Sequence, residues 1–185
     1  MRPSSSDKCQ RGREPVIRED GSIEIPLTQG QVAIVSPESY PLVAVCLWYA
    51  AWSPHPRTYY ARSWVGSRRV DMQVFLFCAR ADHINHDTLD NRTSNLRPAT
   101  CLQNMRNRRK ITVGTSAYKG VYRHKKSWRW CARITIGRRA RTLGSFDDEV
   151  SAARAYDAAA RQHFGEFAFT NEDAGLLPAM KETGT

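Results

Sequence analysis

Between residues 82 and 97 the chain reads DHINHDTLDNRTSNLR. Such a density of Asp, Asn and His does not suit a hydrophobic core, so we expect a polar site here. Asp82 and His83 are adjacent, and Asn95 follows near the end of the stretch. If the intervening residues form a hairpin and a helix begins near Asn95, capped by Thr93 or Ser94, the three side chains converge. The sequence therefore predicts a site built from Asp82, His83 and Asn95.

These three side chains match the requirements of phosphodiester hydrolysis, which needs a base for water and a cation beside the phosphate. The oxygen ligands of Asp82 and Asn95 suit Mg²⁺ or Mn²⁺ better than a thiolate-binding metal. His83 suits the general base because an unperturbed imidazole titrates near neutral pH. The alternative interpretation is an Asx-rich turn whose polar side chains only cap local backbone groups.

The same run resembles the ββα-metal motif of HNH endonucleases, in the variant whose last position is Asn. The resemblance implies that Asp82 and Asn95 bind the metal, that His83 is the general base and that Asn91 braces the hairpin loop. Residues 25–48 and 59–62 also resemble the N-terminal region of phage and bacterial HNH proteins. A phage or mobile-element origin is implied by that resemblance.

One departure from the HNH pattern concerns the strand before the Asp-His pair. Relatives have a His-Arg-aliphatic strand there, whereas this chain has Gln73 and Val74 and a shortened link at 78–81. An altered first strand would weaken turnover without abolishing metal or DNA binding. The alternative function is therefore a catalytically degenerate HNH protein that acts as a sequence-specific DNA-binding regulator.

The charge of the chain points to a polyanionic partner. The formal net charge is +10, and residues 91–146 contain fifteen Lys or Arg and no Asp or Glu. A surface kept basic only for solubility would mix both signs, so nucleic acid is the expected partner. The five cysteines form no Cys-x-x-Cys pair, and no apolar run is long enough to span a bilayer. We therefore expect a reducing cytoplasm, of a bacterium or a phage-infected host, and no membrane.

Beyond residue 118 the pattern changes to three short strand-like runs, at about 120–124, 128–136 and 139–143. A helix is predicted from Asp148 to about Phe164, with Asp147 as its N-cap and Gly165 after its end. In the middle strand Trp130, Ala132, Ile134 and Ile136 alternate with Arg129, Cys131, Arg133 and Thr135. We expect the first set to pack on the helix and the second to form an exposed basic face.

This region resembles the APETALA/ethylene-response-factor DNA-binding domain. The matching motifs are YKGV at 118–121, LGSF at 143–146, ARAYD at 153–157 and FGEFA at 164–168. The resemblance implies that the sheet enters the major groove of DNA through Lys119, Tyr122, His124, Arg129 and Arg133. Ala140 and Thr142 stand where plant members often have Arg and Trp, so the plant sequence preference does not transfer. Arg139 and Arg141 are expected to contact phosphates instead.

The predicted fold is α+β, with a ββα-metal nuclease domain followed by a small three-stranded antiparallel sheet packed on one helix. The predicted divisions are an N-terminal tail at 1–22, the nuclease at 23–110, a linker at 111–117, the DNA-binding domain at 118–171 and a C-terminal tail at 172–185. A basic helix adds Arg106, Arg108 and Arg109 to the DNA contacts. The predicted activity is nicking of double-stranded DNA by a monomer or weak dimer. RNA fits less well, because such a sheet does not suit the narrow major groove of A-form duplexes.

Overall fold

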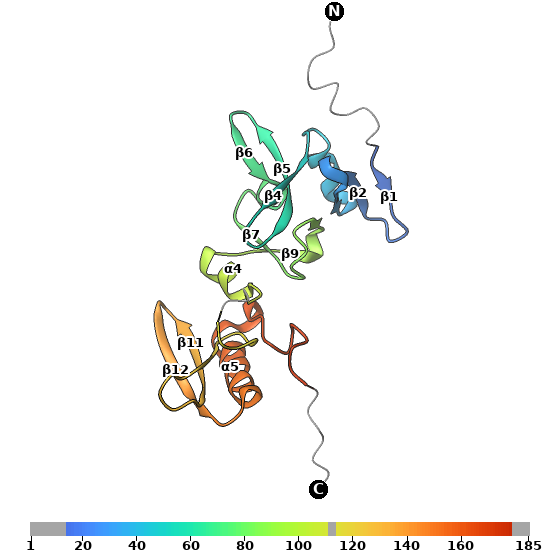
Figure 1. The fold of residues 1–185 in the computed structure, drawn as a ribbon. Coiled ribbons are helices and arrows are strands. Elements are labelled where there is room, and N and C mark those ends of the chain that lie inside the picture. The colour runs from blue at the N-terminus through green and yellow to red at the C-terminus, as the bar shows by residue number, and fades with distance from the viewer. Residues whose placement is uncertain (1–13, 111–113, 179–185) are drawn as a thin grey trace, which may run out of the picture. The chain divides into compact units, whose positions relative to one another are not determined.

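A computed structural model describes residues 14–110 and 114–178 of the chain. The fold is mixed α and β, with several small sheets and few helices (Figure 1). The chain divides into two compact units, Met1–Cys101 and Leu102–Thr185, which we describe one at a time. No helix in the described ranges is both long and apolar enough to cross a membrane.

The N-terminal unit opens with a four-stranded sheet in the order β1-β2-β3-β8. Its strands are β1 (Val16–Ile17), β2 (Ile23–Pro26), β3 (Val32–Val35) and β8 (Asp90–Asn91). A 3-10 turn, η1 (Thr28–Gly30), joins β2 to β3, and β3 pairs with β8 in parallel. This pairing brings the polar stretch around Asn91 against the core strand β3. Strand β1 lies within the predicted tail at 1–22, of which residues 1–13 fall outside the described part.

A second sheet contains β4 (Tyr49–Ser53), β5 (Thr58–Val65) and β6 (Arg68–Asp71), all antiparallel. It is preceded by η2 (Pro37–Ser39) and α2 (Tyr40–Val43) and followed by α3 (Met72–Phe77). The mostly apolar run at residues 69–79 has the composition of a strand, but the strand ends at Asp71 and the helix begins at Met72. Met72 is fully buried, and Phe75 and Leu76 pack on the same core, which is the spacing of a helix face. A short apolar run does not by itself distinguish strand from helix.

The stretch quoted above forms a loop between two paired strands. β7 (Ala81–His83) pairs antiparallel with β9 (Leu96–Pro98), so the hairpin arms flank the polar residues. The helix predicted to begin near Asn95 is wrong, because η3 (Thr93–Asn95) leads into β9 and the helix α4 (Cys101–Asn107) begins later. Thr93 does not cap it, since its amide and hydroxyl bond to Ser36. Leu96 continues as strand because its buried side chain sits opposite His83 in the register.

The C-terminal unit contains a three-stranded antiparallel sheet with one helix packed across it, as predicted. Its elements are β10 (Val121–Arg123), β11 (Trp130–Ile136), β12 (Arg139–Phe146), α5 (Glu149–Phe164) and η4 (Gly165–Phe167). The core joins Val121, Ala132 and Ile134 to the alanine-rich face of α5. The N-cap is Asp148 and not Asp147, because the Asp148 carboxylate accepts from the amide of Ser151 at 2.7 Å. Gly165 follows the helix as predicted.

The edges of this unit extend beyond the predicted domain of 118–171. Thr115 lies in the predicted linker, of which 111–113 are not described, and its hydroxyl accepts from the amide of Arg123 at 3.0 Å. In the predicted tail at 172–185, described as far as residue 178, the amide of Glu172 donates to the buried carboxylate of Asp157 at 3.0 Å. Leu177 packs on the core. The flanking segments therefore belong to the packed unit.

Candidate functional site

Hydrogen bonds between polar side chains and the backbone hold the loop between β7 and β9. The Asn95 amide oxygen accepts from the amide of Asn85 at 2.9 Å, and its nitrogen donates to the carbonyl of Asp90 at 2.7 Å. The Asp90 carboxylate accepts from Asn85 and from Arg92 at 3.0 and 2.7 Å. Burial acts to raise the pKa of Asp90, but the Arg92 bonds outweigh it and hold that pKa below its ordinary value. Asn95 therefore braces the loop.

His83 lies buried at the end of β7, with its Nε2 3.3 Å from Oδ1 of the fully buried Asn91. The Asn91 nitrogen donates to the carbonyl of Leu89, which orients Oδ1 toward the imidazole as an acceptor. Nε2 must then hold the proton, and the lone pair is on Nδ1. Burial lowers the pKa of His83, against the opposing effects of Asn91 and of the Asp82 carboxylate. His83 is thus a neutral imidazole near pH 7, as a general base must be.

Asp82 is buried beside a cation. Its Oδ2 accepts from Nε and from a terminal nitrogen of Arg97 at 3.2 and 3.0 Å, across the β7–β9 pair. Adjacent strand residues project to opposite faces, so Asp82 and His83 leave β7 on different sides. Among the described residues, no group of three or more His, Cys, Asp or Glu is arranged to hold a metal ion. A metal ion beside Asp82 would therefore be bound by one carboxylate and by amide oxygens.

On the C-terminal sheet, Arg133 lies on the face turned away from α5. Its guanidinium carbon is 5.3 Å from the centre of the Tyr122 ring. Ala140 and Thr142 sit opposite Thr135 and Arg133 and share this face. Cys131 was expected to be exposed on it but is buried, with its sulfur 3.2 Å from the Ser145 hydroxyl. Arg133 and Tyr122 therefore lie together on the face of the sheet turned away from α5.

The remaining sheet residues predicted to bind DNA are more dispersed. Arg139 and Arg141 are opposite Ile136 and Ile134 in the register, which puts them on the α5 side of the sheet and not beside Arg133. Arg129 forms an exposed ion pair with Asp147 at 3.0 Å. His124 lies in the β10–β11 turn, where its Nδ1 is 3.1 Å from the Ser127 hydroxyl.

Lys119, predicted to contact DNA, has a different position. Its ammonium donates to the carbonyls of Arg106, Arg108 and Phe169 at 2.7, 2.8 and 3.0 Å. Burial lowers its pKa to about 8, although the nearby Asp157 carboxylate acts to raise it. An ammonium has three donors, and all three are used. Lys119 thus ties the last turn of α4 and the residue Arg108 after it to Phe169, and it has no donor left for a phosphate.

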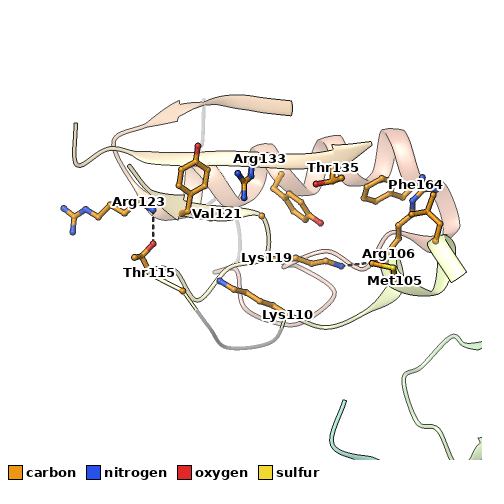
Figure 2. Close-up of a pocket in the computed structure, with 15 residues that line it drawn as sticks. Met105, Arg106, Lys110, Thr115, Lys119, Val121, Arg123, Arg133, Thr135 and Phe164 are labelled. Atoms are coloured by element: carbon orange, nitrogen blue, oxygen red, sulfur yellow. Dashed lines mark hydrogen bonds between the residues drawn. The ribbon is translucent and has the colours of Figure 1, made fainter. Parts of the chain in front are cut away.

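The basic residues at and after the end of α4 also contact protein groups. The Arg106 guanidinium carbon lies 4.5 Å from the centre of the Phe164 ring, and that of Arg109 lies 6.0 Å from the Phe169 ring. Figure 2 shows Arg106 beside Phe164, and the Lys119 side chain points toward Arg106. Arg106, Lys119 and Phe164 border a pocket of about 650 Å³ next to strand β10. The Arg108 side chain is exposed.

No family model matches the chain. It is 28% identical over 153 residues to an uncharacterized HNH endonuclease of Acanthamoeba polyphaga mimivirus, a match that covers 78% of this chain and 76% of that protein. It is 39% identical over 74 residues to an ethylene-responsive transcription factor of Arabidopsis thaliana, over 38% of this chain. It is 48% identical over 60 residues to APETALA2-like protein 2 of Oryza sativa subsp. japonica, over 31% of this chain. These matches span 17% and 14% of the two plant proteins.

The importance of two residues of the N-terminal unit is apparent only from the structure. Arg97 was quoted in the motif without a role, yet it is the partner of Asp82. If residues 81–83 and 96–98 had been paired as the two arms of a hairpin, Arg97 would have been predicted opposite Asp82. Gln73, expected in an altered first strand, lies buried in α3, and its Oε1 lacks a hydrogen-bond donor among the described residues. Nothing in the amino-acid sequence indicates this unpaired acceptor.

Proposed function

We propose that this protein is a metal-dependent DNA endonuclease that hydrolyses phosphodiester bonds. The observation that supports this best is the buried, neutral His83, whose tautomer is set by Asn91. A neutral histidine can accept a proton from water. Similarity to a viral HNH endonuclease over three quarters of the chain agrees with this chemistry.

In this proposal Asp82 and Asn95 hold Mg²⁺ or Mn²⁺. Carboxylate and amide oxygens are the ligands these cations prefer, and Asn95 Oδ1 has a second lone pair beyond the one used by the Asn85 amide. When bound, the cation stabilises negative charge on the phosphate and on the leaving oxygen. His83 takes the proton of the attacking water. Asn91 keeps the imidazole in the required tautomer, and the loop bonds of Asn95 hold the strands of the site together.

In this proposal the C-terminal sheet binds duplex DNA by entering its major groove. Similarity to ethylene-responsive and APETALA2-like proteins supports this part of the proposal. Tyr122, Arg133, Arg129 and His124 contact the groove, and Arg108 contacts a phosphate of the DNA backbone. A monomer with one centre of this kind cuts one strand in each binding event, so the expected first product is nicked DNA.

The direct test is incubation with supercoiled plasmid in Mg²⁺, Mn²⁺ or excess EDTA. We expect cleavage only with metal, and a loss of at least about 100-fold in His83→Ala, the usual range for removing a general base. His163→Ala, which alters an exposed histidine of α5, is the matched control and should cleave normally. Cleavage in EDTA, or full activity of His83→Ala, would contradict the proposed mechanism.

A second candidate function is a DNA-binding regulator without nuclease activity. The ion pair between Arg97 and Asp82 favours it, because an Arg partner competes with a divalent cation for the same carboxylate. The regulator predicts salt-sensitive DNA binding and intact plasmid with either metal. Arg133→Ala weakens binding under both functions, so only the cleavage assay separates them.

A further inference from the structure

The sheet β4–β5–β6 exposes two large aromatic side chains that the proposed chemistry does not use. Trp52 is 52% exposed and Trp64 is 58% exposed. Tryptophan is highly buried on average, so two such side chains on one small sheet call for a functional explanation. They lie on opposite faces, which makes it possible to test one against the other.

The strand register assigns the two faces. Ala61 and Ser63 of β5 are buried and define the inner face, and Trp52 is on that side because it pairs with Tyr59. The residues between them point outward. The outer face therefore contains Tyr60, Arg62 and Trp64 of β5, with Arg69 and Asp71 of β6 as their cross-strand partners and Tyr49 and Ala51 of β4 beside them.

This outer face alternates aromatic rings and guanidinium groups. The guanidinium carbon of Arg69 lies 5.3 Å from the centre of the Trp64 ring, which holds both side chains in place. Arg62 is neutralised by Asp71 at 2.6 Å, so the cation of the outer row is Arg69. A fixed aromatic ring next to a cation is the pattern of surfaces that stack nucleobases and contact the adjoining phosphate.

The row of outer-face residues leads to the candidate nuclease centre. Tyr60, two positions before Arg62 on the same face, has its ring centre 6.4 Å from that of His83. A strand lying along β5 would thus pass from Trp64 and Arg69 toward the proposed general base. A second copy of this chain on the same face would place two Arg69 guanidinium groups against each other, whereas a nucleic-acid strand supplies the opposite charge.

We propose that the outer face of β4–β5–β6 binds an unpaired stretch of DNA, with a base stacked on Trp64 and a phosphate on Arg69. Unpaired DNA is the fitting ligand because bases in a duplex already stack on each other and do not present their faces to a side chain. The link to cleavage rests on the proposed function, but the binding surface itself is tested without metal and without cleavage.

Photochemical cross-linking locates the contact in the unmodified protein. The full chain is irradiated in EDTA with a single-stranded oligonucleotide that contains 5-iododeoxyuridine, then digested with trypsin. We expect the cross-link on the peptide of residues 63–68, which trypsin releases between Arg62 and Arg68 and which contains Trp64. Cross-links found only on the peptide with Trp52, or only in the C-terminal unit, would overturn the proposal.

Affinity of the variants gives a second, independent measurement. Trp64→Ala should weaken binding of the single-stranded oligonucleotide roughly 5- to 150-fold, as expected for one lost base stack. Arg69→Gln should weaken it less and reduce its salt dependence. Trp52→Ala, with similar exposure on the inner face, should bind as the parent does. Equal effects of the two Trp substitutions, or binding of duplex DNA alone, would refute the assignment, and neither result depends on whether the protein cuts DNA.

Discussion

Gly120 offers the sharpest test of the C-terminal packing. It precedes β10 with a φ of +76°, and a Cβ added there would lie 1.9 Å from Cδ2 of Tyr156. Tyr156 is buried against the sheet, and burial raises its pKa to about 12. The Gly120 carbonyl also accepts from the amide of Arg133 at 2.8 Å. A substitution of Gly120 would therefore also disturb the position of Arg133, which is predicted to contact DNA.

The cost of Gly120→Ala has two parts. The left-handed backbone costs an L-residue about 1–2 kcal/mol, and forcing a methyl group into a packed site costs about 1–3 kcal/mol. Together these destabilise the C-terminal unit by about 2–5 kcal/mol. Gly137, in the β11–β12 turn, has a φ of +55° and nothing within 4 Å of its added Cβ. Gly137→Ala therefore incurs only the backbone part, and the difference between the two variants isolates the steric part.

Native-state hydrogen exchange at the amides of β11 measures this difference, because it reports the C-terminal unit separately from the other unit. We expect Gly120→Ala to lose about 1–3 kcal/mol more protection than Gly137→Ala. Adding Tyr156→Leu to Gly120→Ala should recover part of that loss, since it removes the atoms in conflict. Equal losses in the two glycine variants would refute the steric argument.

Three further predictions concern buried polar groups. Lys119→Met should destabilise the C-terminal unit by about 2 kcal/mol by removing three charged hydrogen bonds. For duplex DNA, the slope of log binding constant against log salt concentration should stay unchanged in Lys119→Met but fall by about one in Arg133→Ala. A reduced slope for Lys119→Met would show that Lys119 does contact DNA. Asp157→Ala removes the acceptor of two Asn171 donors, at 2.9 and 2.7 Å. The free energy of unfolding, measured by urea denaturation, should fall by about 1–3 kcal/mol. An unchanged midpoint would show that the segment after α5 does not stabilise the fold. The folded-state pKa of His83 is below its ordinary value of 6.5, so the unfolded chain takes up this proton first as the pH falls. The stability of the protein should therefore fall as the pH drops below about 6.5, until the folded-state pKa is passed. Thermal melts from pH 7.5 to 5 should show less of this loss in His83→Gln.

Part of the candidate nuclease site could be anticipated from the sequence. The resemblance to HNH endonucleases implied that Asn91 braces the hairpin loop, and in the structure its amide oxygen lies 3.3 Å from Nε2 of His83, since buried amides in a tight loop pair with neighbouring polar groups. The start of the helix could not be placed from Thr93 and Ser94. Good capping residues also bond to distant side chains, and Ser36 captures Thr93 from another part of the chain. The pairing of Asp82 with Arg97 likewise depended on the register of β7 and β9.

Local patterns determined the three-stranded sheet, its helix and the alternation of β11 except at Cys131, because period and capping are properties of neighbouring residues. They also determined the basic character of the chain and the polar loop between β7 and β9. Only the tertiary structure decided which cations remain available for DNA. Lys119 and Arg133 have the same charge in the sequence, yet burial directs one to three carbonyls and leaves the other on an open face. Burial and strand register, which both arise from residues far apart in the chain, made that distinction.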